Sequence, residues 1–187
     1  MAEPDTSRLL PFLQRVGRLR VTFGFVAAGV AFWFATPSWA SLGAGAGVAA
    51  VGEALRVWAA GHIRKGREVT ASGPYRLTRH PLYLGSLVMG LGFVVAAANI
   101  VVSTVVVGYL VVMLGVAITL EQAMLREKFG ADYDRYAGGQ LETPDRRFSL
   151  SLARRNGEYR TLVGFVAALG VLGLKVWLAR SDSGLTF

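Results

Sequence analysis

The chain has 187 residues, of which 53% are hydrophobic, and its formal net charge at pH 7 is +8. This length suits one domain, and the apolar content exceeds that of ordinary soluble proteins, which favours an integral membrane protein. Nucleic-acid binding is not favoured, because the cations are spread over separate connections and not gathered on one soluble module. The absence of cysteine excludes disulfides, thiolate metal ligands and a cysteine nucleophile.

Five segments are candidate membrane helices by apolar length, the first being the shortest. They cover about residues 21–36, 41–60, 82–99, 100–120 and 162–179. A soluble helical bundle is the alternative, but these segments lack the polar faces that such a bundle needs. We therefore predict an all-α, polytopic membrane bundle of about five transmembrane helices, in a single membrane domain over residues 1–187.

The cations indicate how the chain is oriented. Most of the 20 Lys and Arg residues lie before the first segment, between the second and third, and between the fourth and fifth. The positive-inside rule assigns these alternate connections to the cytoplasm. We expect a protein of the bacterial inner membrane, with its N-terminus inside and its C-terminus outside. Residues 1–20 form a cytoplasmic segment, for which an amphipathic surface helix and a frayed tail both fit.

The second segment contains two features of interest. Its glycines at positions 43, 45 and 47 have no preceding strand, so they favour close helix packing over dinucleotide binding. Glu53 and Arg56 lie one turn apart on one helix face. Charges within a membrane are costly, so these two residues are candidate substrate contacts, or else they neutralise each other.

The most distinctive stretch, residues 73–85, precedes the third segment and reads GPYRLTRHPLYLG. Gly73 and Pro74 predict a turn, and Pro81 suits the first position of a helix. Only Ala98-Asn99 separates the third segment from the fourth, which predicts a tight antiparallel hairpin. That hairpin returns the chain to the side of the motif, where the fourth segment ends.

Glu121 begins an expected amphipathic cytoplasmic helix that runs to Tyr136 and that Gly130 can break. The aromatic residues of this helix fit either internal packing or a cap over the motif. Residues 145–187 are expected to hold an interfacial stretch and the last transmembrane helix, which serves in anchoring or subunit contact.

The chemistry available to this chain is limited. The only histidines, His62 and His80, define neither a nucleophile context nor a metal site. What remains is a cytoplasmic cluster of Arg, His, Tyr and Glu side chains at a helix start. Such a cluster suits a zwitterionic ligand that carries hydroxyl groups.

Over residues 53–144, the order of the motif, the hairpin and the following glutamate resembles the isoprenylcysteine carboxyl methyltransferase family and its relatives, the phospholipid N-methyltransferases. The resemblance implies a membrane methyltransferase core that uses S-adenosylmethionine. In that family an Arg-His-Pro-x-Tyr element and a Glu-Glu pair bind the cofactor. The matching residues of this chain are Arg79, His80, Pro81, Tyr83 and Glu121, and Gln122 replaces the second glutamate. An amide keeps hydrogen-bonding capacity but has no charge.

Arg79 suits the carboxylate of this cofactor, Glu121 its ribose hydroxyls or ammonium, and an aromatic ring its sulfonium or adenine. His80 and Glu121 are the candidate bases if the acceptor must lose a proton. The acceptor is expected to be a lipophilic or isoprenoid molecule from the bilayer. The alternatives are an NADPH-dependent membrane reductase and a non-enzymatic module that binds lipid headgroups. The predicted catalytic residues are Arg79, His80 and Glu121, and the predicted cofactor site comprises Tyr75, Arg79, His80, Pro81, Leu82, Tyr83, Gly85, Glu121 and Gln122.

Overall fold

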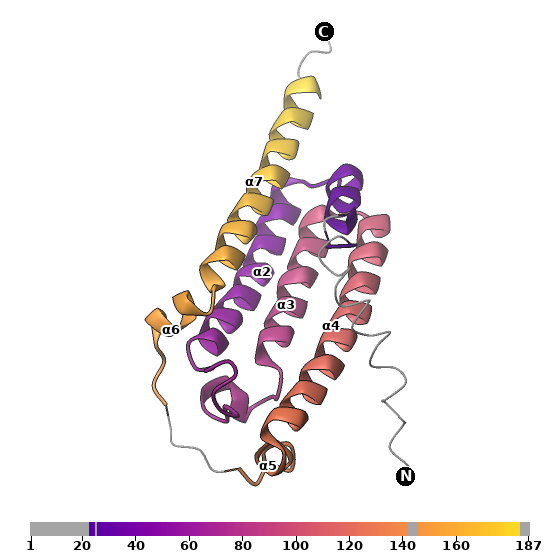
Figure 1. Ribbon diagram of the computed structural model, residues 1–187. Coiled ribbons are helices and arrows are strands. Elements are labelled where there is room, and N and C mark those ends of the chain that lie inside the picture. Colours follow the sequence, from indigo (N-terminus) through magenta and orange to yellow (C-terminus); the bar gives the residue numbers. More distant parts are fainter. Residues whose placement is uncertain (1–22, 25, 142–145, 184–187) are drawn as a thin grey trace.

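The computed structural model describes residues 23–24, 26–141 and 146–183, so the expectations for residues 1–20 lie outside the described residues. The regular structure of the described part is entirely helical, which confirms the all-α prediction (Figure 1). Residues 26–34 are helical. The elements that follow are α2 (Trp39–Ala60), η1 (Gly73–Arg76), α3 (Pro81–Ala97), α4 (Ile100–Phe129), α5 (Ala131–Ala137), α6 (Leu150–Arg155) and α7 (Glu158–Ser183).

Helices α2 and α3 pack with their backbones in contact, because glycine faces the neighbouring helix. A Cβ added to Gly45 would lie 2.4 Å from the Ala96 amide nitrogen, and one added to Gly52 would lie 2.4 Å from that of Met89. No larger residue fits at these positions unless the helices separate. The expected close packing is therefore confirmed at Gly45, whereas a Cβ at position 43 or 47 would meet nothing within 4 Å.

The predicted hairpin between α3 and α4 is confirmed, and its two connecting residues explain the turn. Ala98 adopts the left-handed conformation with φ of 48°. The Asn99 side-chain oxygen then caps α4 by accepting from the amides of Val101 at 2.9 Å and Val102 at 3.3 Å. The expected apolar segment at residues 100–120 and the first part of the expected amphipathic helix form one continuous helix, because the 30 residues of α4 run from Ile100 to Phe129. It ends where Gly130 separates it from α5, so the break expected at Gly130 is found.

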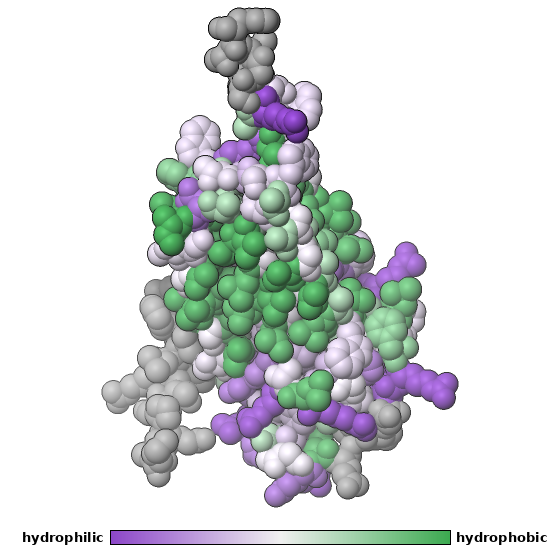
Figure 2. All heavy atoms as spheres, turned by 180° about the vertical axis from the view of Figure 1, so that it is seen from behind, coloured by the Kyte–Doolittle hydropathy of each residue, from purple (hydrophilic) through white to green (hydrophobic). Residues whose placement is uncertain are grey.

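In the described part, α4 and α7 are the two helices long and apolar enough to cross a membrane, fewer than the five expected. Helix α3 is apolar but has only 17 residues. Helix α2 contains Glu53, Arg56 and four glycines, which lower its hydropathy. The first expected segment lies partly outside the described residues. Figure 2 shows a broad hydrophobic band across the helices and hydrophilic side chains gathered at one end, as in a membrane protein.

Candidate functional site

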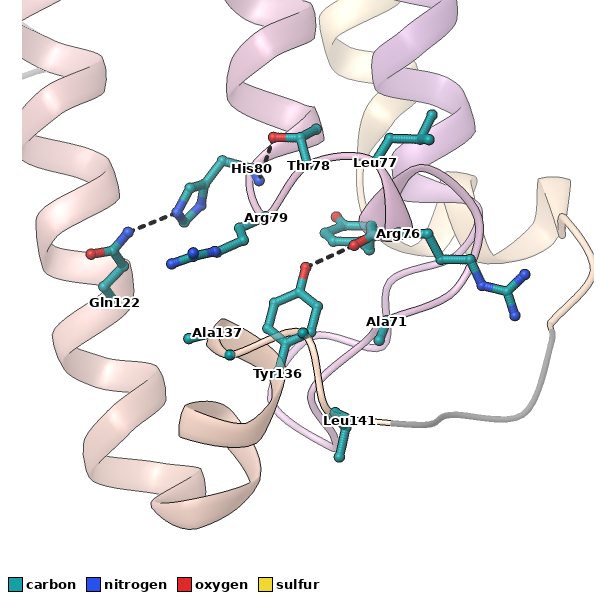
Figure 3. A pocket seen from close by; sticks show the side chains of 13 residues that line it. Ala71, Arg76, Leu77, Thr78, Arg79, His80, Gln122, Tyr136, Ala137 and Leu141 are labelled. Carbon is teal, nitrogen blue, oxygen red and sulfur yellow. Dashed lines mark hydrogen bonds between the residues drawn. The ribbon is translucent and has the colours of Figure 1, made fainter.

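A pocket of about 1020 Å³ lies at the hydrophilic end of the bundle, where the loop before α3 meets α4 and α5 (Figure 3). Four predicted cofactor residues line it: Tyr75, Arg79, His80 and Gln122. The other lining residues are Ala71, Arg76, Leu77, Thr78, Tyr136, Ala137, Gly138, Gly139 and Leu141. The structure therefore brings together two parts of the predicted site that are far apart in the sequence, one before α3 and one late in α4.

The loop that carries this site needs glycine at position 73 for two reasons. Its φ of +56° is a conformation that other residues rarely adopt. A Cβ there would also lie 2.5 Å from the His62 ring. His62 is buried, and its Nδ1 donates to the Trp58 carbonyl oxygen at 2.9 Å. The end of α2 thus fixes the turn from which Tyr75 and Arg79 project.

His80 joins the loop to α4. It is the N-cap residue of α3, just before Pro81 at the first helical position. Its Nε2 lies 3.0 Å from the Gln122 amide nitrogen, and its Nδ1 lies 3.9 Å from a Glu121 carboxylate oxygen. Burial lowers the pKa of His80, Glu121 opposes that shift, and Arg79 adds to it. The imidazole is therefore neutral at pH 7.

Tyr136 on α5 was not among the predicted site residues, yet it lines the pocket. Its hydroxyl donates to the Tyr75 carbonyl oxygen at 3.0 Å. Burial and the neighbouring Tyr133 raise the pKa of Tyr136 to about 12, so the hydroxyl keeps its proton at neutral pH. Tyr133, by contrast, is fully buried. Of the two interpretations of these aromatics, packing fits Tyr133 and a cap over the motif fits Tyr136.

Tyr136→Phe is expected to destabilise the protein by about 1 kcal/mol, because it leaves the partly buried Tyr75 carbonyl without this donor. Chemical unfolding in detergent measures the effect. Tyr159→Phe is the matched control, since Tyr159 is 50% exposed and its hydroxyl meets only the adjacent Arg160 among the described residues. Equal losses in the two variants would contradict a specific role for the Tyr136 hydrogen bond.

The remaining predicted cofactor residues do not line the pocket. The Tyr83 ring centroid lies 5.8 Å from that of His80, so Tyr83 and Glu121 both flank His80 from outside. Pro81 is buried, and the Leu82 carbonyl accepts from the Ser86 hydroxyl. A Cβ on Gly85 would lie 2.6 Å from Arg56 Cγ, which places Gly85 in the α2–α3 contact.

Arg56 has a partner that the sequence analysis did not identify. Its Nε donates to Glu158 Oε1 at 2.6 Å, and its Nη2 donates to the Thr161 hydroxyl at 3.2 Å. It also contacts Ser86 on α3. Glu53 lies 3.9 Å from Arg56 Nε, and neither of its carboxylate oxygens has a hydrogen bond within the described part. The expected pairing with Glu53 is therefore secondary to an ion pair with α7.

These features define a class: an all-helical membrane protein with a polar pocket at one end of its bundle. The sequence pattern of the phospholipid methyltransferase family matches residues 19–132, and the chain belongs to this family of membrane methyltransferases. The expected family relationship is thus confirmed. The chain is also similar to the cobalt-zinc-cadmium resistance protein CzcN of Cupriavidus metallidurans, with 34% identity over 133 residues. That alignment covers 66% of this chain and 60% of the relative. No solved structure matches the chain.

Proposed function

We propose that the protein transfers a methyl group from S-adenosylmethionine to a lipophilic acceptor at the cytoplasmic face of the membrane. The observation that carries this proposal is the pocket in which Arg79 and His80 of the loop meet Gln122 of α4, in a chain of the phospholipid methyltransferase family. The pocket has the size of a site for a nucleoside-sized ligand. Its lining combines two arginines, Arg76 and Arg79, with two tyrosines and a neutral imidazole.

The residues of the pocket fit the functional groups of this cofactor. Arg79 is exposed, and no hydrogen bond or ion pair of its side chain is found in the described part, so it is available for the carboxylate. In Figure 3 its side chain extends into the space between Gln122 and Tyr136. Glu121 does not line the pocket but lies beside His80, and we propose that it binds the ribose hydroxyls or the ammonium. When bound, S-adenosylmethionine supplies a sulfonium methyl group that is already reactive, so the protein contributes mainly positioning.

The family and the surroundings of the pocket support a lipid acceptor. The pocket lies next to the start of α3, where the hydrophilic end of the molecule gives way to the hydrophobic band. We propose that α2, α3 and the segment at residues 21–36 cross the membrane together with α4 and α7. In the bacterial inner membrane this topology places the N-terminus and pocket inside and the C-terminus outside. We propose that the methyltransferase core of the chain covers residues 53–144.

Calorimetric titration of the detergent-purified protein with S-adenosylmethionine and S-adenosylhomocysteine tests the cofactor. We expect saturable binding that weakens at least tenfold in Arg79→Ala, because a charge-assisted hydrogen bond contributes about 1.5–3 kcal/mol. Arg79→Lys is expected to fall between the two, since lysine cannot make the bidentate contact. Arg64→Ala is the matched control, because Arg64 is exposed and does not line the pocket.

Two outcomes would contradict the proposal. A folded wild type that binds neither compound would favour a module that binds lipid headgroups. Equal weakening by Arg79→Ala and Arg64→Ala would show a general charge effect and would remove Arg79 from the site.

The acceptor is tested by methyl transfer from labelled S-adenosylmethionine. We expect lipid acceptors to be methylated faster than water-soluble ones.

A further inference from the structure

The contact between Gln122 and His80 determines where the imidazole carries its proton. The two atoms in contact are the Gln122 side-chain nitrogen and His80 Nε2, 3.0 Å apart (Figure 3). A primary amide nitrogen only donates hydrogen bonds, so the ring nitrogen opposite must accept. A neutral imidazole has one accepting and one donating nitrogen. Nε2 is therefore the unprotonated nitrogen, and the proton lies on Nδ1.

The groups on the other side of the ring agree with this arrangement. Nδ1 lies 3.9 Å from a Glu121 carboxylate oxygen, too far for a hydrogen bond but close enough for an N–H dipole to be favoured there. The second charged neighbour is Arg79, which disfavours a positive ring. Burial has the largest effect on the pKa of His80 and lowers it from its ordinary value. Burial and Arg79 together outweigh Glu121, so the ring is neutral.

We propose that Gln122 is a positioning residue that holds His80 as a neutral imidazole protonated on Nδ1, with its Nε2 lone pair occupied. A carboxylate at position 122 would have the opposite effect, because it only accepts hydrogen bonds and would require a proton on Nε2. The ring would then lie between two carboxylates and would favour the charged form. The amide at position 122 thus selects one tautomer and one charge state.

This arrangement divides the roles of the two candidate bases, a step that rests on the proposed function. With Nε2 occupied by Gln122, His80 has no free lone pair with which to remove a proton from an acceptor. It presents an N–H donor instead. Glu121, whose side chain is 30% exposed, is then the base of this site for any acceptor that must lose a proton.

Nitrogen NMR of the protein labelled with ¹⁵N-histidine tests the tautomer directly and needs no cofactor. The chain contains only two histidines, and the His80→Asn variant identifies the His80 signals by their loss. His62 is an internal reference, because its Nδ1 donates to a backbone carbonyl. We expect wild-type His80 at pH 7.5 to show a protonated Nδ1 and an unprotonated Nε2. A wild-type His80 protonated on Nε2 would overturn the proposal.

Gln122→Glu is expected to move the proton to Nε2 or to give the doubly protonated ring, and to raise the midpoint of the His80 titration. The His62 signals should not change. Gln140→Glu is the matched control, since it adds the same charge at an exposed position and should leave the His80 spectrum as in the wild type. An unchanged His80 spectrum in folded Gln122→Glu would contradict the role of Gln122. The wild-type spectrum decides the tautomer even if this variant does not fold.

A binding comparison tests the consequence for the cofactor. The side-chain nitrogen of asparagine takes roughly the place of ring Nδ1, and that of glutamine roughly the place of Nε2. If the Nδ1–H is the useful donor, His80→Asn should lose clearly less affinity for S-adenosylhomocysteine than His80→Gln, by about tenfold. The reverse order would overturn the assignment of the donor. Absence of binding in the wild type would instead contradict the proposed function and leave the NMR result unaffected.

Discussion

Replacing Gly52 by alanine is expected to destabilise the protein by about 2 kcal/mol, although alanine is the better helix former. The added Cβ would lie 2.4 Å from the Met89 amide nitrogen and 2.6 Å from the Gly85 carbonyl oxygen. Both neighbours are backbone atoms, so no side chain can rotate away. Helices α2 and α3 would have to move apart. Chemical or thermal unfolding in detergent measures the loss.

Gly47→Ala is the matched control in the same helix. A Cβ at position 47 would meet nothing within 4 Å, so the variant gains helix propensity without a clash. We expect it to be neutral or to stabilise the protein by up to about 1 kcal/mol. The two substitutions are chemically identical and should have effects of opposite sign. Equal effects would show that the α2–α3 contact does not depend on backbone approach at Gly52.

The same glycines show what could be predicted from the sequence. The pattern of small residues in α2 predicted close packing, but it did not identify the side of the helix that meets α3. Residues two apart on a helix point in different directions, so Gly45 faces α3 while Gly43 and Gly47 do not. Local signals were more reliable. The turn at Gly73 and the hairpin at Asn99 follow from the conformations and caps of single residues.

The apolar segment and the amphipathic helix were expected as two consecutive elements, but the apolar segment and the part of the amphipathic helix before Gly130 form one continuous helix, α4, because no residue before Gly130 interrupts the backbone. Glu121 and Gln122 end the apolar run, yet the backbone stays helical as far as Phe129, and Gly130 ends the helix. Polar residues in a long helix mark where its apolar part ends, and the helix itself can continue beyond them. The hairpin brings Gln122 to His80, because α3 and α4 run antiparallel from the turn at Ala98-Asn99. Gln122 lies far enough along α4 to reach the start of α3.

Contacts between residues far apart in the chain could not be predicted in the same way. Tyr136 reaches the Tyr75 carbonyl across 61 positions, and its spacing from Tyr133 indicated only an amphipathic helix. Arg56 and Glu158 are separated by 102 positions. The one signal for this pair was an acidic residue beside the last apolar segment, since such a residue requires a partner when it is buried.

Glu158→Ala is therefore expected to have an effect larger than that of Gly52→Ala, about 3 kcal/mol or more, because it leaves Arg56 without its closest charged partner. The side chains of Arg56 and Glu158 are only 17% and 7% exposed. Asp132→Ala is the control, since it breaks an ion pair with Arg135 whose side chains are both more than half exposed, and it should cost at most about 1 kcal/mol.

The double variant Arg56→Met/Glu158→Leu separates the two explanations for such a loss. If the loss comes from an isolated buried charge, removing both charges should restore much of the stability. Arg56 also contacts Ser86 on α3 and Thr161 on α7, so the double variant should still hold α7 less firmly against the α2–α3 pair. A loss of less than 1 kcal/mol in Glu158→Ala would contradict the ion pair. A large loss with recovery in the double variant would show that this ion pair attaches α7 to α2, and that α7 is more than a separate membrane anchor.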